Sequence, residues 1–373
     1  MEKIDKEKKR KLCVFPNDPL EAYYKKGEIK EKYFNPNNFF DEIHVFSPTE
    51  NDIDPIKIKS TVGNAEIFIH TIGKLNLINF KFKLKNILKI VKKINPDIIR
   101  SYNPLMQGWL AIKVGEKMSL PVVISIHNNY DKDVRTFYKK NKKYLKYLKF
   151  LYSEKFIEKY VLSNATKIIC AYRFLVPYAK RHGGRNIEVI YNRVNLSRFS
   201  PEIKPKFSFD KKAIIYVARL DPEKNHECII KAITKLDVKL ILIGNGVMLE
   251  RLKSIVQELK LEEKVIFISS VSNSELGSYY NSADIFAAPI KQGGVSIPML
   301  EAMACGLPLI ISAREDNEIE DIDDAVLFTK NNPDDFKKAI LKLINEPRLQ
   351  EDLIQKGLAK IKMLDGLKME EKE

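Results

Sequence analysis

The chain has 373 residues, of which 45% are hydrophobic and 30% charged, and its formal net charge is +15. This length exceeds what a single hydrophobic core organises, so we expect two domains, and the composition excludes a disordered chain. The positive charge leaves nucleic acid, an anionic lipid surface or a phosphorylated substrate open as partners, beside a solvated surface on which lysine alternates with glutamate.

Short apolar runs alternate with helical patterns along the chain, which is typical of parallel sheets covered by helices. In the first half we expect strands at residues 12–15, 43–46, 67–70, 97–100, 122–127, 167–171 and 188–191. The Pro-containing residues 200–212 predict a linker. A second series of strands is expected at residues 213–219, 239–243, 265–269, 284–288, 309–312 and 325–328. The sequence therefore predicts two doubly wound α/β domains, with ligands bound at the carboxyl ends of strands, in a cleft between the domains.

The cysteines and the hydropathy pattern indicate where the protein resides. The four cysteines are far apart, and their spacing matches neither a zinc site nor a disulfide framework: Cys13, Cys170, Cys228 and Cys305. No uninterrupted apolar stretch of about 18 residues occurs, and the N-terminus is charged without an apolar signal core. We therefore expect a cytoplasmic protein, with peripheral contact to the inner membrane face left open.

A turn between a strand and a helix carries two cations. The strand at residues 213–219 ends in Arg219, and Lys224 follows before the next helical pattern. Arginine offers a planar fork to phosphate oxygens and lysine a mobile point charge, so the pair suits a diphosphate whose charge grows as it leaves. The alternative is a surface turn with incidental charges. Asn225 is expected to cap the helix that follows.

Glycines mark the end of the next strand in the second series. Gly244 and Gly246 follow residues 239–243. Glycines at such a place either let a ligand approach backbone amides or make a tight turn.

The most informative segment runs over residues 289–308. The glycine pair Gly293 and Gly294 precedes an apolar helix with one acidic residue, Glu301, and Gly306 is expected at its C-cap. A lone carboxylate in an apolar helix needs a partner, and the hydroxyls of a ribose would serve. The N-terminus of this helix would direct amides and a positive dipole at phosphate.

Together these residues resemble the donor-binding domain of glycosyltransferase family 4, the glycosyl transferases group 1, which are retaining enzymes of the GT-B fold. The matching elements of the second half stand in the family's order: Val217-Ala218-Arg219-Leu220 with Lys224, Ile243-Gly244-Asn245-Gly246, Val265 to Val271, Ala283-Asp284 with Pro289, and Gly293 to Pro308. In the first half, the family's motifs are matched by Pro96 to Arg100, Val122 to His127, and Val189 to Asn195 with Phe199.

The resemblance implies a GT-B fold, in which two Rossmann-like doubly wound parallel-sheet domains face each other across a cleft. The N-terminal acceptor-side domain would comprise residues 1–198 and the C-terminal nucleotide-sugar-binding domain residues 199–354, with a C-terminal helix at about 355–373 packing back onto the first. The implied activity is retaining hexosyl transfer from a nucleoside-diphosphate sugar to a hydroxyl of a glycan or lipid-linked acceptor, in cell-surface polysaccharide or glycolipid synthesis. No cofactor and no metal are expected.

The resemblance also assigns site residues. It implies a catalytic group in which His127 lies near the transferred sugar, and the full set is His127, Arg219, Lys224 and Glu301. A structural histidine satisfied by a neighbouring loop is the alternative for His127. The implied donor-binding residues are Gly244, Gly246, Gly293, Gly294, Val295, Ser296 and Ile297. The family usually carries a Glu, seven residues and a second Glu; here Glu301 is the second, and Gly293 stands at the first position.

The stretch from Phe137 to Tyr160 interleaves lysine and aromatic residues at helical spacing. It predicts a helix whose apolar face lies on a membrane interface with its lysines against anionic headgroups, or else a core-facing helix with a solvated basic side.

Two other functions stay open. A GT-B fold nucleotide-sugar epimerase would act on the donor alone, and a non-catalytic nucleotide-sugar-binding protein is suggested by Gly293. Nucleic-acid binding is not expected, because no recognition motif accompanies the charge. The remaining histidines form no metal-ligand pattern.

Overall fold

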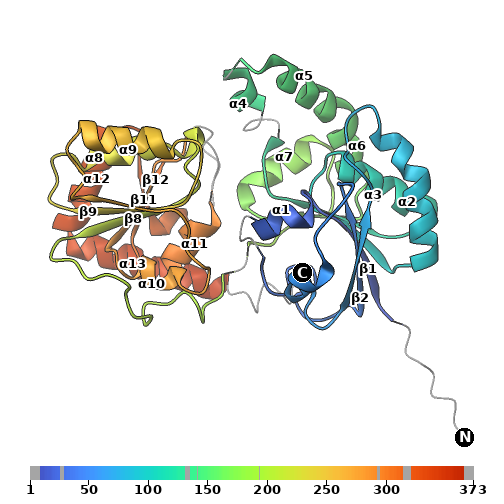
Figure 1. The fold of residues 1–373 in the computed structure, drawn as a ribbon, viewed down its shortest axis with the longest axis horizontal. Coiled ribbons are helices and arrows are strands. Elements are labelled where there is room, and N and C mark those ends of the chain that lie inside the picture. The colour runs from blue at the N-terminus through green and yellow to red at the C-terminus, as the bar shows by residue number, and fades with distance from the viewer. Residues whose placement is uncertain are drawn as a thin grey trace, which may run out of the picture. The chain divides into compact units, whose positions relative to one another are not determined.

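The computed structural model describes residues 9–25, 29–130, 135–140, 142–192, 194–291, 295–313 and 321–364. The chain forms two compact units, of which unit 1 ends at Tyr191 and unit 2 begins at Asn192 (Figure 1). The sequence places the boundary after residue 198. In the structure the linker residues belong to unit 2, where the Nδ2 amide of Asn281 donates to the carbonyls of Ser200 (2.9 Å) and Ile203 (2.7 Å).

Unit 1 is built on a seven-stranded parallel sheet with the order β3-β2-β1-β4-β5-β6-β7. Its strands are β1 (Lys11–Phe15), β2 (Glu42–Ser47), β3 (Glu66–Thr71), β4 (Ile98–Ser101), β5 (Val122–Ile126), β6 (Lys167–Cys170) and β7 (Ile187–Val189). Its helices are α1 (Leu20–Lys25), η1 (Pro55–Val62), α2 (Phe80–Ile94), α3 (Met106–Met118), α4 (Arg135–Lys140), α5 (Tyr144–Ser153), η3 (Glu154–Glu158), α6 (Lys159–Asn164), η4 (Arg173–Leu175) and α7 (Val176–Arg181).

The first sheet buries alternate residues of its strands on opposite faces, as the two-residue period of a strand requires. On one face, Val14 of β1 and Val45 of β2 join Leu20 of α1 and the η1 residues Ile58 and Val62 in a single apolar cluster. This packing holds β1 and β2 under the N-terminal helices, so the carboxyl ends of these strands are placed by a rigid core.

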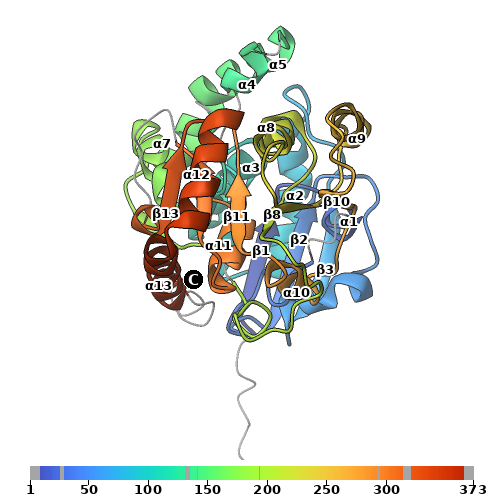
Figure 2. The same cartoon turned by 90° about the vertical axis from the view of Figure 1, so that its left-hand side faces the viewer.

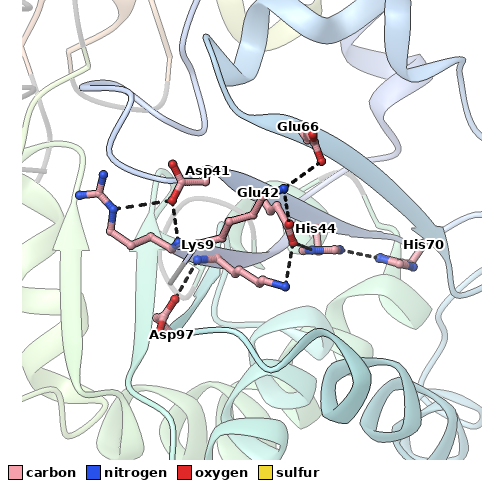
Figure 3. A network of polar contacts seen from close by, with 9 residues as sticks. Lys9, Asp41, Glu42, His44, Glu66, His70 and Asp97 are labelled. Carbon is pink, nitrogen blue, oxygen red and sulfur yellow. Dashed lines mark hydrogen bonds and ion pairs between the residues drawn. The ribbon is translucent and has the colours of Figure 1, made fainter. Parts of the chain in front are cut away.

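A network of charged side chains lies at the amino ends of β1 and β2 (Figure 3). The carboxylate of Glu42 forms ion pairs with the ammonium groups of Lys9 and Lys11, each at 3.0 Å. Its Oε2 also lies 3.3 Å from Nε2 of His44. The other ring nitrogen of His44 is 3.1 Å from Nε2 of His70. Burial disfavours the ionised form of Glu42, but its lysine and histidine partners prevail and lower its pKa to about 2.

Unit 2 is built on a six-stranded parallel sheet with the order β10-β9-β8-β11-β12-β13. Its strands are β8 (Ala213–Val217), β9 (Lys239–Ile243), β10 (Val265–Ile268), β11 (Ile285–Ala288), β12 (Leu309–Ser312) and β13 (Val326–Thr329). Its helices are η5 (Pro222–Lys224), α8 (His226–Ala232), α9 (Leu249–Glu258), α10 (Leu276–Tyr280), α11 (Ile297–Ala304), η6 (Asp323–Ala325), α12 (Pro333–Asn345) and α13 (Pro347–Met363). Helices α8, α9 and α12 cover one face of this sheet and α10 and α13 the other (Figure 1), and Figure 2 shows the strands from β13 at one edge to β10 at the other.

The strands and the two-domain architecture that the sequence predicts are confirmed. Each expected strand is present with ends within two residues of those predicted. Two parallel-sheet, Rossmann-like domains result. Helix α13 packs on α11 within unit 2, where a Cβ on Gly357 would lie 2.7 Å from Cγ of Met303. Residues 365–373, the rest of the segment expected to pack on the first domain, lie outside the described residues.

All four cysteines are free and buried in the units' cores. Cys13 and Cys170 lie in strands of unit 1, whereas Cys228 and Cys305 belong to unit 2. Burial raises the pKa of each thiol.

The expected single helix from Phe137 to Tyr160 is wrong in its continuity. The chain forms α4, then α5, then the π-helical turn η3 and α6. The break lies before α5, where Lys142 has a φ of 54° and the amide of Lys143 donates to the carbonyl of Tyr138. A left-handed residue ends a right-handed helix, so α4 is separated from the helical run of α5, η3 and α6, which continues from Tyr144 to Asn164. The side chain of Phe137 lies outside the described residues.

Candidate active site

The order of the second sheet places the predicted cations at a switch point. Strand β8 lies between β9 and β11. From β8 the chain continues through β9 to β10 at one edge, and the later strands β11, β12 and β13 lie on the other side of β8. Ligands of open α/β sheets bind at the carboxyl ends of strands at such points. Arg219 lies two residues beyond β8, and Lys224 ends the turn η5.

Arg219 is held by carboxylates of its own turn. Its guanidinium lies 2.7 Å from Oδ2 of Asp221 and 3.7 Å from Oε1 of Glu223. The Arg219 side chain is 66% exposed, and ion pairs at such exposure contribute little free energy. An incoming anion can therefore compete with Asp221 for the guanidinium at small cost.

Lys224 is partly buried, and its ammonium group forms no hydrogen bond or salt bridge within the described part of the chain. Burial lowers its pKa, and the nearby charge of Arg219 acts in the same direction. The backbone is fixed below it, since the hydroxyl of Tyr216 donates to the carbonyl of Lys224 at 3.0 Å. A partly desolvated cation on a fixed turn favours an anionic ligand.

Glu301 is buried in α11, with 7% of its surface exposed. Its Oε2 accepts a hydrogen bond from the hydroxyl of Tyr280 at 3.0 Å. Burial and the Glu301 carboxylate raise the pKa of Tyr280 well above its usual range, so this hydroxyl stays a donor. A carboxylate can accept further hydrogen bonds beside that of Tyr280. The sequence indicated that Glu301 needs a partner but gave no signal for Tyr280.

Gly244 and Gly246 let two loops approach each other closely. A Cβ on Gly244, at a φ of 148°, would lie 2.0 Å from the carbonyl oxygen of Ala218, and a Cβ on Gly246 would lie 2.5 Å from that of Leu220. The amide of Gly244 donates to Ile268. The two glycines therefore bring the loop after β9 against the backbone on both sides of Arg219.

The start of α11 is described from Val295 onward. Val295 is buried, Ser296 occupies the N-cap position with extended backbone, and Ile297 is the first helical residue. The C-cap of the helix is Cys305, one residue before the predicted position, and Gly306 follows it with a left-handed φ of 75°. Gly293 and Gly294 lie outside the described residues, so their predicted contact with the donor stays a prediction.

Asn331, which the sequence did not single out, connects the loops of the site. Its Nδ2 amide lies 3.0 Å from the carbonyl of Ile290 and its Oδ1 accepts from Nδ2 of Asn225 at 2.8 Å. The prediction that Asn225 caps α8 is wrong. Asn225 stands at the N-cap position in a left-handed conformation with a φ of 51°, and its side chain makes no capping bond. A capping asparagine has an extended backbone that turns its side-chain oxygen toward the helix amides, and the left-handed backbone of Asn225 does not, while its Nδ2 amide donates to Asn331.

His127 lies at the carboxyl end of the first sheet, one residue beyond β5. Its ring is parallel to that of Tyr102, with centroids 6.0 Å apart and planes 11° apart. Tyr102 directly follows β4, and the guanidinium of Arg100 lies 4.8 Å from the same ring. Because β4 and β5 are neighbours, His127 lies at the end of unit 1 where polar ligands of such sheets bind.

Among the described residues no group of three or more His, Cys, Asp or Glu side chains is arranged to hold a metal ion. In the same part of the chain, no helix combines the length and hydrophobicity needed to cross a bilayer.

Comparison with known families covers both units. The glycosyl transferases group 1 family matches residues 199–360, and glycosyltransferase family 4 matches residues 41–198. The two matches meet after residue 198 and together span most of the chain.

Individual proteins agree with these matches. The chain is 26% identical over 298 residues to an uncharacterised glycosyltransferase of Methanocaldococcus jannaschii, covering 78% of this chain and 79% of that protein. It is 25% identical over 299 residues to the alpha-monoglucosyldiacylglycerol synthase of Streptococcus pneumoniae, covering 74% of this chain and 65% of the synthase.

The fold also matches a solved structure. Anabaena Alr3699/HepE, in complex with UDP and glucose, superimposes with a TM-score of 0.71 at 13% identity, covering 96% of this chain and 97% of that one. Each half of the chain thus matches a glycosyltransferase family in sequence, and the whole chain matches a solved structure in fold. The chain belongs to the group 1 glycosyltransferases of family 4, enzymes built on the two Rossmann-like domains of the GT-B fold.

Proposed function

We propose that this glycosyltransferase takes its sugar from a nucleoside-diphosphate sugar. The acceptor is a hydroxyl of a glycan or lipid-linked molecule, in cell-surface polysaccharide or glycolipid synthesis. The main support is the turn that follows β8 in unit 2, which carries two cations. There a partly buried Lys224 and an exposed Arg219 lie at the carboxyl end of the strand.

The charges of this turn suit a leaving diphosphate. Negative charge grows on the diphosphate as its bond to the sugar breaks, and donors fixed in place before the reaction stabilise it most. Arg219 and Lys224 supply the positive charge that a magnesium ion would otherwise provide, so the proposal includes no metal. The ribose hydroxyls would donate to the carboxylate of Glu301, which can accept several hydrogen bonds besides that of Tyr280.

The proposal includes retention of configuration at the sugar. The acceptor oxygen attacks the anomeric carbon on the face from which the diphosphate departs, forming the new C–O bond as the old one breaks. The departing diphosphate oxygen takes the acceptor proton, and His127 of unit 1 contacts the sugar hydroxyls. Proton NMR of the product distinguishes the two anomers, and an inverted product would refute this part of the proposal.

The acceptor class is supported by the relatives. The synthase of Streptococcus pneumoniae is named for a glucosylated diacylglycerol, which is a glycolipid. A lipid acceptor places the enzyme at a membrane surface during turnover.

A matched pair of lysine variants tests the donor site. Lys224→Ala should abolish sugar transfer while the circular dichroism spectrum stays that of the wild type. Lys231→Ala is the control, because Lys231 lies on the next helix and pairs with Glu227 at the surface. A panel of nucleotide sugars is screened first for the donor that raises the unfolding temperature, since a bound ligand stabilises the folded state by mass action.

The outcomes of this test separate the candidate functions. Consumption of the donor without any acceptor indicates an epimerase or hydrolase, and binding without turnover indicates a nucleotide-sugar-binding protein. Unchanged transfer by Lys224→Ala would remove Lys224 from the mechanism.

We further propose that α5 contacts an anionic membrane. Leu145 and Leu148 are 86% and 58% exposed, and the exposed apolar side chains continue with Tyr152 and Phe156 at helical spacing. Exposed lysines border this stripe, including Lys149. Apolar residues inserted among headgroups, with lysines beside anionic lipids, are the features of an interfacial helix.

Sedimentation with vesicles tests this surface. The wild type should co-sediment with phosphatidylglycerol vesicles at low salt but not with phosphatidylcholine vesicles, and Leu145→Glu with Leu148→Glu should abolish the binding. The control is Ile56→Glu with Ile78→Glu, because these two residues are 82% and 83% exposed outside α5. Equal binding by both double variants would show that α5 is not the contact.

A further inference from the structure

The side chain of Asn331 is bonded at both ends to loops of the candidate site. Its Nδ2 amide donates to the carbonyls of Ile290 (3.0 Å) and Pro289 (3.3 Å), in the loop that leads to α11. Its Oδ1 accepts from Nδ2 of Asn225 at 2.8 Å. Asn331 comes from a third loop, after β13, so it joins elements that are distant in the sequence.

The hydrogen bonds of Asn331 hold Asn225, the residue after Lys224, and a backbone hydrogen bond holds Glu223, the residue before it. The amide of Lys291 donates to the carbonyl of Glu223 at 2.9 Å. The residues immediately before and after Lys224 are thus both tied to residues 289–291. Together with the Tyr216 hydroxyl on the Lys224 carbonyl, these contacts fix the lysine backbone from three directions.

Two asparagines that are adjacent in the sequence have different partners. Asn332 caps α12, because its side chain accepts from the amide of Asp335 at 3.0 Å. Asn331 contributes nothing to that cap and faces the other loops instead. The side chain of Asn225 likewise makes no capping bond to α8. Two asparagines are therefore used to hold loops rather than helix ends.

We propose that Asn225 and Asn331 form a positioning pair that sets the place of Lys224 relative to the loop entering α11, and thereby the affinity for the donor diphosphate. This inference rests on the proposed function. A diphosphate that contacts both Lys224 and the start of α11 binds best when those two elements are held at a fixed separation before it arrives.

Position 331 requires the side chain of an asparagine. One short group must both donate to backbone carbonyls and accept from Asn225. Aspartate accepts but cannot donate, and it adds a negative charge near the diphosphate site. Alanine does neither, while glutamine keeps both functions on a longer stem.

Nucleotide binding tests the pair. UDP, GDP and ADP are titrated calorimetrically, and the one that binds the wild type is used for the variants. Asn331→Ala should weaken its binding about tenfold, which corresponds to the loss of one or two hydrogen bonds. Asn331→Gln should recover part of that loss. Asn332→Ala, the matched control, should lower the unfolding temperature through the lost cap but leave the nucleotide affinity unchanged.

A second variant shows whether the two asparagines act as one unit. Asn225→Gly keeps the left-handed backbone without strain and removes only the side chain. The double variant Asn225→Gly with Asn331→Ala should bind no more weakly than Asn331→Ala alone, because both changes break the same bridge. Additive losses would refute the pairing.

Hydrogen exchange provides a readout that needs no nucleotide. The amide of Lys291, bonded to Glu223, should exchange at least tenfold faster in Asn331→Ala and at the wild-type rate in Asn332→Ala. Unchanged exchange, or faster exchange without loss of affinity, would overturn the inference. If the wild type binds none of the three nucleotides, the proposed function fails, and the exchange rates alone decide whether the bridge fixes the two loops.

Discussion

Protonation of His226 is expected to destabilise unit 2 below neutral pH. The His226 ring is 2% exposed and packs against Tyr216 with centroids 4.6 Å apart. Neither ring nitrogen has a hydrogen-bond partner in the described part of the chain. Burial, followed by the charge of Lys224, lowers the pKa of His226 from 6.5 to about 3.

The size of the effect follows from the two pKa values. Between pH 6.5 and pH 3 the unfolded chain binds a proton at His226 and the folded chain does not. The contribution of neutral His226 to the free energy of unfolding is therefore fully present above pH 6.5. Below that pH it decreases by about 1.4 kcal/mol for each pH unit. Between pH 7 and pH 5 the loss from this one residue is about 2 kcal/mol.

Urea unfolding of His226→Phe at pH 7 and pH 5 measures this loss. Phenylalanine keeps an aromatic ring against Tyr216 and cannot be protonated. Far-UV circular dichroism follows both units, and the fluorescence of Trp109, the single tryptophan, identifies the transition of unit 1. The wild type should lose about 2 kcal/mol more than the variant in the unit 2 transition. Equal losses would refute the assignment of a buried, neutral His226.

Three other changes have defined outcomes. Gly244→Ala places a Cβ 2.0 Å from a backbone oxygen at a φ of 148°, so urea unfolding should show a loss of roughly 3 kcal/mol or more in unit 2; a loss below that of Gly183→Ala, where the nearest atom is at 3.1 Å, would contradict this. Tyr280→Phe removes a donor from buried Glu301 and should cost about 1 to 3 kcal/mol of stability and raise the donor KM, and unchanged values would exclude the role of this hydroxyl. Burial and then the charge of His44 lower the pKa of His70 to about 4, so unit 1 should lose stability as the pH falls from 6.5 to 4, less in His70→Gln, as read from Trp109 fluorescence; identical pH profiles would argue against it.

The sequence predicted the strands and the cation turn because their signals are local. Apolar runs such as residues 239–243 give the same strand in the structure, and the sheet order then brings their carboxyl ends together. The helix end beside Gly306 was predictable for the same reason, since a helix end depends on a few neighbouring residues.

The contacts that complete the site join residues distant in the chain, and the sequence does not reveal them. Asn225 and Asn331 are 106 residues apart, and a local rule assigned Asn225 to a helix cap instead. Tyr280 and Glu301 meet across two helices without any shared motif. The left-handed Lys142 was missed because lysine has no preference for that conformation.

The buried cysteines give each half of the enzyme its own chemical reporter. Only the thiolate reacts with alkylating reagents, and in the folded state burial both shields these thiols and keeps them protonated. A brief pulse of reagent therefore marks Cys13 and Cys170 when unit 1 opens, and Cys228 and Cys305 when unit 2 opens. Peptide mass spectrometry of the labelled wild-type protein can then measure whether a bound donor slows the opening of one unit or of both.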